Sequence, residues 1–200
     1  MDDTDVITDD DDADACRPPA LLSAGYRDCS LHALAACENS NQLFWGPDDR
    51  CGHATRKEEI WEALDHFLTG APTPYDTEDA GYVAASDIGE ALLGPGPGQH
   101  LASGEWFFSG FTPHAAMVRA AAVFDARGNI IAVALLDDDG DARSLYVYSH
   151  GSLRADDCTR FQSWARNVTS DAFPNDTPSR LDGTIVIELG SKRWTTKRLP

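Results

Sequence analysis

The second half of the chain contains short β-type runs separated by turn sequences, and this spacing restricts the fold more than any other feature. The expected strands, rich in aromatic, branched or small apolar residues, are residues 106–109, 117–124, 130–136 and 145–149. The connections at 125–129 and 137–141 carry the Gly, Asn and Asp residues of hairpin turns. Strands joined by such short connections pair as antiparallel neighbours, so we predict an antiparallel β-meander.

Helical periodicity appears on both sides of this meander. The clearest helix is predicted over residues 56–69, where Ile60, Leu64 and Phe67 fall on one face. Further helices are predicted over residues 30–38, 86–94 and 156–167, and a final strand pair over 184–189 and 193–197. Helices of this length cannot bury an apolar face alone, so we predict an α+β fold in which a twisted antiparallel sheet carries packed helices.

The chain is long enough for one domain with a real core, because 42% of its 200 residues are hydrophobic. Residues 1–15 form an acidic run with almost nothing to bury and are predicted to be a disordered tail. Residues 16–200 are predicted to form a single domain. Within it we distinguish a cysteine-rich extension (16–54), a central part (55–150) and a helix and hairpin extension (151–200).

The net charge indicates which partners the chain favours. Eight aspartates lie within residues 2–14, and removing them from the formal net charge of −17 leaves −9 for the rest. Such a surface repels nucleic acid and anionic lipid, and it accelerates encounter with a basic protein. No apolar run is long enough to span a bilayer. We therefore expect a basic protein partner, with no nucleic acid and no membrane span.

The cysteines bear on the compartment. The five cysteines, Cys16, Cys29, Cys37, Cys51 and Cys158, include no C-x-x-C pair, which favours a disulfide framework over a metal or redox site. Two bridges would leave one cysteine unpaired, and the spacing alone does not assign the pairing. We expect a periplasmic or secreted protein whose signal or lipid-anchor segment has been removed from this sequence.

The connection between the first two predicted strands is the candidate functional segment. Pro113 and His114 lie between residues 106–109 and 117–124, so an imidazole there would project from a loop tip. We predict a partner-binding site formed by Phe111, Thr112, Pro113, His114 and Ala115. A histidine with a purely structural or surface role is the alternative at this position.

This segment also resembles a known family. The pattern Ser109-x-x-x-Pro113-His114, followed eight residues after the histidine by Ala122-Val123-Phe124, is similar to the signature loop of the inhibitor-of-vertebrate-lysozyme family. The family loop reads Cys-Lys-Pro-His-Asp-Cys, and its histidine enters the active-site cleft of a lysozyme. The resemblance covers about residues 55–150 and implies a helix packed on an antiparallel sheet, with the loop joining two strands.

The resemblance implies an inhibitor of a lysozyme-like peptidoglycan hydrolase, not an enzyme, with no cofactor and no metal. The target would be a basic host lysozyme or a bacterial effector, and in the second case the chain would be an immunity protein. This sequence matches two of the six positions of the family loop, Pro113 and His114. Phe111 and Ala116 replace the two loop cysteines, and Ala115 replaces the acid after the histidine.

Other functions remain open from the sequence. Asp28-Cys29-Ser30 before a predicted helix resembles papain-like peptidoglycan amidases, in which Cys29 would be the nucleophile and His114 the base. A structural or adhesion domain is a further alternative. The run Asp137–Asp141 lacks the spacing of a calcium-binding EF-hand loop and is interpreted as a hairpin turn.

Overall fold

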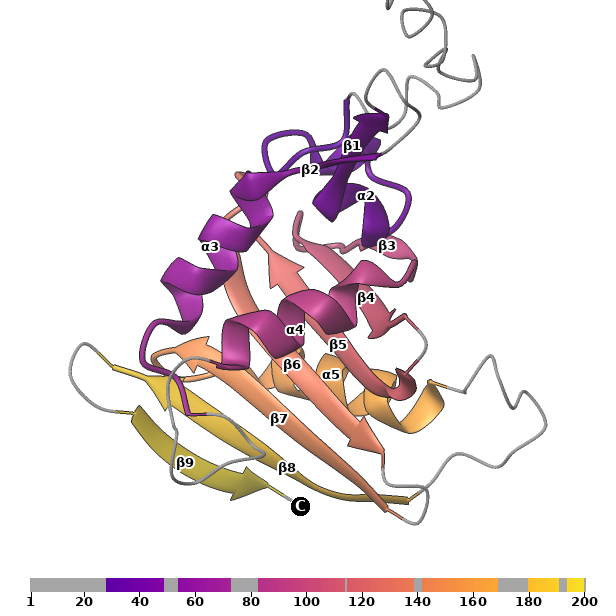
Figure 1. Cartoon of the computed structure of the whole chain (residues 1–200). Helices are drawn as coiled ribbons and strands as arrows, with labels where there is room; N and C mark the ends of the chain where they lie inside the picture. Colours follow the sequence, from indigo (N-terminus) through magenta and orange to yellow (C-terminus); the bar gives the residue numbers. More distant parts are fainter. Residues whose placement is uncertain are drawn as a thin grey trace, which may run out of the picture.

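The computed structural model of the protein describes residues 28–48, 54–72, 83–113, 115–138, 142–168, 180–190 and 194–199. A seven-stranded β-sheet forms its middle layer. Helices α3 (Glu58–Leu68) and α4 (Val83–Leu93) cross one face of this sheet, and α5 (Ala155–Asn167) covers the other (Figure 1). The predicted α+β class is confirmed.

The order of the strands across the sheet follows their order in the chain. The strands are β3 (Gly98–His100), β4 (Trp106–Thr112), β5 (Ala115–Phe124), β6 (Ile130–Asp138), β7 (Ala142–His150), β8 (Arg180–Leu189) and β9 (Trp194–Leu199). Strands β3 to β7 form an antiparallel meander, and β8 and β9 form an antiparallel pair. The predicted strands are present, and most extend beyond their predicted ends.

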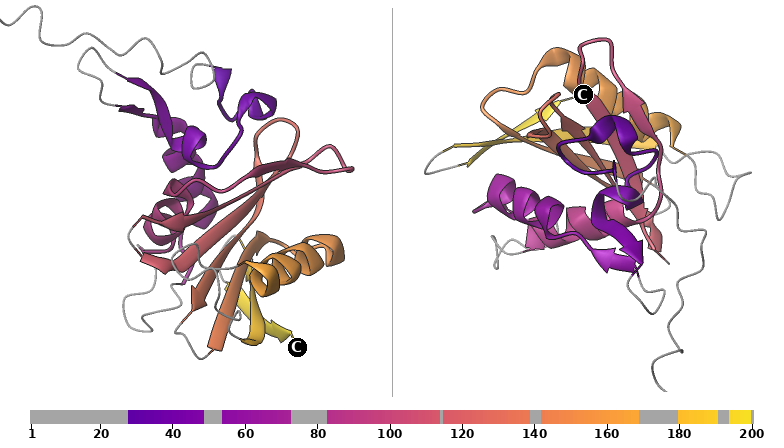
Figure 2. Two further views of the ribbon diagram at one scale, coloured as in Figure 1. Left: turned by 90° about the vertical axis from the view of Figure 1, so that its right-hand side faces the viewer. Right: turned by 90° about the horizontal axis from the view of Figure 1, so that it is seen from above.

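One strand pair departs from the antiparallel prediction. Strands β7 and β8 are parallel, with Leu145 opposite Thr184 and His150 opposite Leu189. Two parallel strands need a long connection, because the chain must return to the end of the sheet where the first strand began. Helix α5 lies within the connection between β7 and β8. Helix α5 therefore sits on the face opposite α3 and α4, as the side view in Figure 2 shows.

The sheet is buried on both faces. Along β5, Ala120, Ala122 and Phe124 belong to the core beneath α3 and α4, whereas Ala121 and Val123 belong to the core beneath α5. This alternation follows from the two-residue period of side chains along a strand. It explains why residues 120–124 form a continuous apolar run rather than an alternation of polar and apolar residues.

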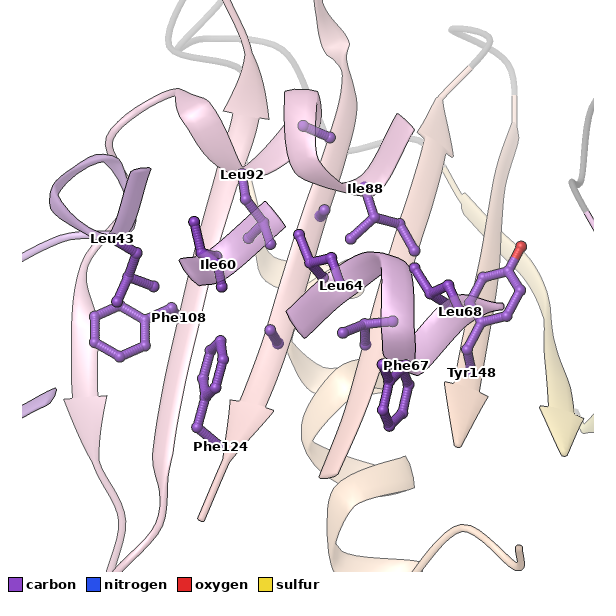
Figure 3. Packing of buried hydrophobic residues seen from close by; sticks show 14 of the residues in the cluster. Leu43, Ile60, Leu64, Phe67, Leu68, Ile88, Leu92, Phe108, Phe124 and Tyr148 are labelled. Atoms are coloured by element: carbon purple, nitrogen blue, oxygen red, sulfur yellow. The ribbon is translucent and has the colours of Figure 1, made fainter. Parts of the chain in front are cut away.

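The apolar stripe predicted on α3 is confirmed. Ile60 and Leu64 are fully buried, and Phe67 is 7% exposed. They pack with Ile88 and Leu92 of α4 (Figure 3). Burying each of these side chains stabilises the fold by roughly 1.5–3 kcal/mol.

The helix predicted over residues 30–38 is wrong. A disulfide joins Cys29 to Cys37 with a Cα–Cα distance of 4.7 Å, whereas eight residues of α-helix rise about 12 Å. The segment instead turns and contains a short 3-10 helix, Leu34–Ala36. Helix α2 (Asn41–Phe44) and the pair β1 (Trp45–Asp48) and β2 (Ala54–Arg56) follow it.

The described part of the cysteine-rich segment packs into the same core as the sheet. Leu34, Leu43 and Phe44 are buried there with α3 and α4. Lys57, just before α3, donates hydrogen bonds from Nζ to the carbonyl oxygens of Cys29 and Gln42. Burial lowers the pKa of Lys57, and the neighbouring Glu59 opposes that shift.

Candidate functional site

The predicted site lies where β4 turns into β5. Thr112 pairs with Ala115, so only residues 113 and 114 stand between the two strands. Of the predicted site residues, Phe111 and Thr112 end β4, Ala115 begins β5, and Pro113 is exposed. His114 lies outside the described residues. The connection is shorter than predicted because both strands extend toward it.

The β5 side of this hairpin is irregular. Phe111 pairs with Arg119 and the next residue, Thr112, pairs with Ala115, so β5 carries three additional residues between these two pairs. Met117 is one of them and is 54% exposed, which makes it the one large hydrophobic side chain exposed in the described part of the chain. Bulges of this kind re-aim side chains at functional edges. Met117 and Pro113 therefore supply apolar contact surface beside the connection.

The base of the hairpin is fixed against the end of α4. The backbone N–H of Gly94 donates to the carbonyl oxygen of Phe111 at 2.9 Å. A Cβ atom on Gly94 would lie 2.8 Å from the Phe111 ring, and one on Gly110 would lie 2.6 Å from the Gly94 oxygen. Phe111 is half-buried by this contact. Close contact at two glycines thus holds the base of the hairpin against the end of α4.

The arginine side chains of the neighbouring strands β5 and β7 are buried. Arg119 of β5 is 5% exposed, and Arg143 of β7 is 3% exposed. The Arg143 guanidinium meets the carboxylate of Asp138 at 2.7 Å, and Asp137 lies opposite Val118 across the β5–β6 pair. Neither arginine presents its charge to solvent, so these two cations do not oppose the approach of a basic partner to this end of the sheet.

A groove opens beside the hairpin on the α5 face. It has a volume of about 710 Å³ and is lined by Ser109 of β4 and by Arg160, Trp164 and Asn167 of α5. The hairpin and the C-terminal end of α5 lie at the same end of the sheet, because Arg143 also donates to the carbonyl oxygens of Ala165 and Val168. The hairpin therefore projects next to a concave surface.

The arrangement needed for a cysteine amidase is not formed by Cys29. Its sulfur is bonded to Cys37, and the residue is 1% exposed. Residues 29–33 are not helical. The helix dipole that the amidase hypothesis requires at Cys29 is therefore not formed by this segment. The free thiol in the described part of the chain is that of Cys158, whose pKa is raised by burial against the opposing effects of Lys197 and Arg166.

Sequence reasoning missed the residues that hold and extend the site. Gly94, Gly110 and Met117 were not among the predicted site residues, yet they anchor the hairpin or widen its contact surface. A signal for Gly110 was present, because glycine within a strand often marks the close approach of another backbone. Met117 gave no comparable signal, since its exposure depends on the irregular pairing of β5.

Comparisons with protein-family models, with curated proteins and with solved structures find no match to this chain. No cluster of three histidine, cysteine or acidic side chains suited to a metal ion occurs among the described residues. Likewise, no helix in that part of the chain is long and apolar enough to cross a membrane. The candidate site therefore rests on the geometry of the β4–β5 hairpin and on the residues that it carries.

Proposed function

We propose that this protein inhibits a lysozyme-like peptidoglycan hydrolase by inserting the β4–β5 hairpin into the catalytic cleft. The observation that carries the proposal is the anchored two-residue connection that contains the Pro-His pair. Thr112 and Ala115 close the hairpin, Pro113 is exposed, and Phe111 is fastened to Gly94. A hairpin whose base is already held in place loses less conformational entropy when it docks, which favours its use to block a cleft.

The chemistry of the target explains why a histidine suits this position. A lysozyme cleft holds two carboxyl groups, one protonated as the general acid and one ionised. An imidazole between them can donate a hydrogen bond to the ionised carboxylate and contact the acid. We assign this role to His114, with Pro113 restricting the backbone before it. Phe111, which is partly exposed, and Met117, which is 54% exposed, offer apolar surface from the two strands that flank this connection.

Long-range charge supports a basic target. The chain without its acidic first residues carries a formal net charge of −9, and opposite charge is what would draw a hydrolase to an anionic cell wall and to this protein alike. Attraction between opposite charges raises the association rate more than it raises the final affinity. We infer that the acidic body steers encounter while the hairpin determines how long the complex lasts.

The disulfide between Cys29 and Cys37 supports a location outside the reducing cytosol. We therefore propose a periplasmic or secreted location, where peptidoglycan hydrolases act. A hydrolase delivered by a rival cell is one target class, and the protein would then serve as an immunity protein. A host lysozyme is the other.

The test is a peptidoglycan digestion assay with host lysozymes and bacterial hydrolases, each with and without the protein. The wild-type protein should leave peptidoglycan intact when alone and should block at least one of these enzymes. His114→Ala should lose that inhibition, whereas His100→Ala, which alters a histidine on β3, should keep it. Digestion of peptidoglycan by the protein alone, abolished by Cys29→Ser, would favour the amidase function instead.

A further inference from the structure

A second concave surface lies at the opposite end of the sheet from the β4–β5 hairpin. It is a pocket of about 470 Å³. The β5–β6 turn, the start of β6 at Ile130 and the end of β7 at His150 form one side of it. Helix α3 and the segment tied by the Cys29–Cys37 disulfide form the other side. The pocket is thus separate from the proposed inhibitory hairpin.

The side chains around this pocket contrast with the charge of the whole protein. His32, His66 and His150 all line it, together with Arg127. The chain has six histidines and a formal net charge of −17, so half of its histidines meet at one pocket in a strongly acidic molecule. Between these polar groups the lining is apolar and includes Leu31, Phe67 and Ile130.

The walls of the pocket are held in place by specific contacts. Asp125 accepts hydrogen bonds from the backbone N–H groups of Arg127 and Asn129, which fixes the β5–β6 turn. Gly128 adopts a φ of +84° in this turn, and a Cβ atom there would lie 1.8 Å from the carbonyl oxygen of Leu31. The Leu31 N–H in turn donates to Glu59 of α3. Turn, disulfide segment and helix therefore form one rigid frame.

The imidazole of His150 has a defined orientation. Its Nε2 lies 2.9 Å from the carbonyl oxygen of Phe67, and its ring packs edge-on against the Phe67 ring at 4.7 Å. A carbonyl oxygen can only accept, so Nε2 carries the proton and donates. The other nitrogen, Nδ1, is then available to a ligand. No ion pair joins the Arg127 guanidinium to a carboxylate among the described residues.

The spacing of these groups decides between a metal ion and a larger ligand. No three of the described histidine, cysteine or acidic side chains lie close enough to hold one metal ion. A ligand that contacts Arg127 and more than one histidine must therefore extend across the pocket. Its apolar lining suits a hydrophobic body, and its basic side chains suit an anionic group.

We propose that this pocket binds a small organic anion, with an aromatic or aliphatic body against Leu31, Phe67 and Ile130 and an acidic group held by Arg127 and the histidines. Arg127 provides a permanent positive charge, and each imidazole provides at least one hydrogen-bonding nitrogen. Ligands of this kind occupy pockets of a few hundred cubic ångströms.

The test uses the full chain and two fluorescent probes that share an apolar body. The first, 8-anilinonaphthalene-1-sulfonate, carries an anionic group, and the second, N-phenyl-1-naphthylamine, is its neutral counterpart. The sulfonate should bind one site at least 10-fold more tightly than the neutral amine. The double variant His66→Ala/Arg127→Ala should weaken sulfonate binding at least 10-fold, while the control double variant His100→Ala/Arg166→Ala should leave it within 2-fold.

A measurement on the wild-type protein removes any dependence on how the variants fold. Titration with the sulfonate should shift the imidazole NMR signals of His66 and His150 and leave that of His100 in place. Equal affinity for both probes, unchanged binding by the His66→Ala/Arg127→Ala variant, or shifts confined to His100 would each overturn the proposal.

Discussion

The two faces of the sheet are joined to their helices by different interactions. Helices α3 and α4 pack through a continuous apolar layer in which Ile60, Leu64 and Ile88 are fully buried. On the α5 face a smaller apolar core is supplemented by ionic contacts, and Asp157 is fully buried between Arg154 and Arg160. The stability of the α3 and α4 face therefore depends on apolar packing, whereas that of the α5 face also depends on charged groups that must remain paired.

The ionic contacts of the α5 face connect separate elements. Arg154 also binds Glu105, just before β4, and hydrogen bonds from Arg154 lower the pKa of that carboxyl group. At the other end of the helix, Arg143 of β7 donates to the carbonyl oxygens of Ala165 and Val168. These carbonyls lie at the helix C-terminus, where a cation interacts favourably with the helix dipole.

The largest loss of stability is expected from removing the buried charge of Arg143 on the α5 face. Arg143→Met leaves Asp138 without its 2.7 Å partner and removes the donor to two carbonyl oxygens. We expect the free energy of unfolding to fall by about 3–5 kcal/mol in urea denaturation. Arg166→Met, which alters an exposed arginine of α5, should change the free energy of unfolding by less than about 0.5 kcal/mol. Similar values for the two variants would contradict an ionic role for this face.

A smaller effect is expected where the apolar face meets the hairpin. A methyl group at Gly110 would lie 2.8 Å from the backbone of Leu92, so Gly110→Ala must displace either α4 or β4. Overpacking of this kind destabilises by about 1–3 kcal/mol, and here it should also weaken inhibition because the hairpin base moves. Ser152→Ala, at an exposed position after β7, is the control and should retain inhibition. Full inhibition by Gly110→Ala would show that the base need not be rigid.

The smallest change in stability is expected at a carboxyl group on α4. Burial, aided by the charge of Glu90, raises the pKa of Asp87 to about 6. The folded state therefore retains the proton while the unfolded chain loses it, so stability falls as pH rises from about 4 to 6. Asp87→Asn removes this penalty and should stabilise the protein at pH 7 by about 1–2 kcal/mol, a range reduced for the partial exposure of the group.

Thermal or urea denaturation across pH provides the measurement for Asp87. The stability gained by Asp87→Asn over the wild type should be full above about pH 6, should shrink as the pH falls from about 6 to 4, and should be absent below about pH 4, where the wild-type carboxyl is protonated in both states. An advantage that does not vary with pH would mean that the substitution acts through packing rather than through charge.

The apolar face was largely predictable from the sequence, and the α5 face was not. The period of Ile60, Leu64 and Phe67 identified a packed helix, and the turn sequences between strands identified the meander. In contrast, the pairing of Asp157 with two arginines and of Arg143 with α5 depends on distances between elements that no local pattern contains. The parallel alignment of β7 and β8 is non-local in the same way.

The sequence placed the Pro-His pair between two strands, whereas it did not indicate the contacts that hold this connection. The Pro-His pair pointed to the β4–β5 connection, whereas the attachment of Phe111 to Gly94 joins segments that are distant in the sequence. At the N-terminal side, local helical periodicity gave the wrong result for residues 30–38. There a disulfide that closes eight residues requires a compact turn, and this covalent restraint overrides the local preference.

A double-mutant cycle on the complex tests the central claim most directly. It combines His114→Ala in this protein with replacement of the catalytic carboxylate by its amide in a hydrolase that the protein inhibits. If the imidazole contacts that carboxylate, His114→Ala should weaken binding by about 30- to 1,000-fold, mainly through faster dissociation, without changing the melting temperature. The two substitutions should then be coupled by about 1–3 kcal/mol. Additive effects, or a His114→Ala variant that is unstable yet still inhibits, would contradict the account.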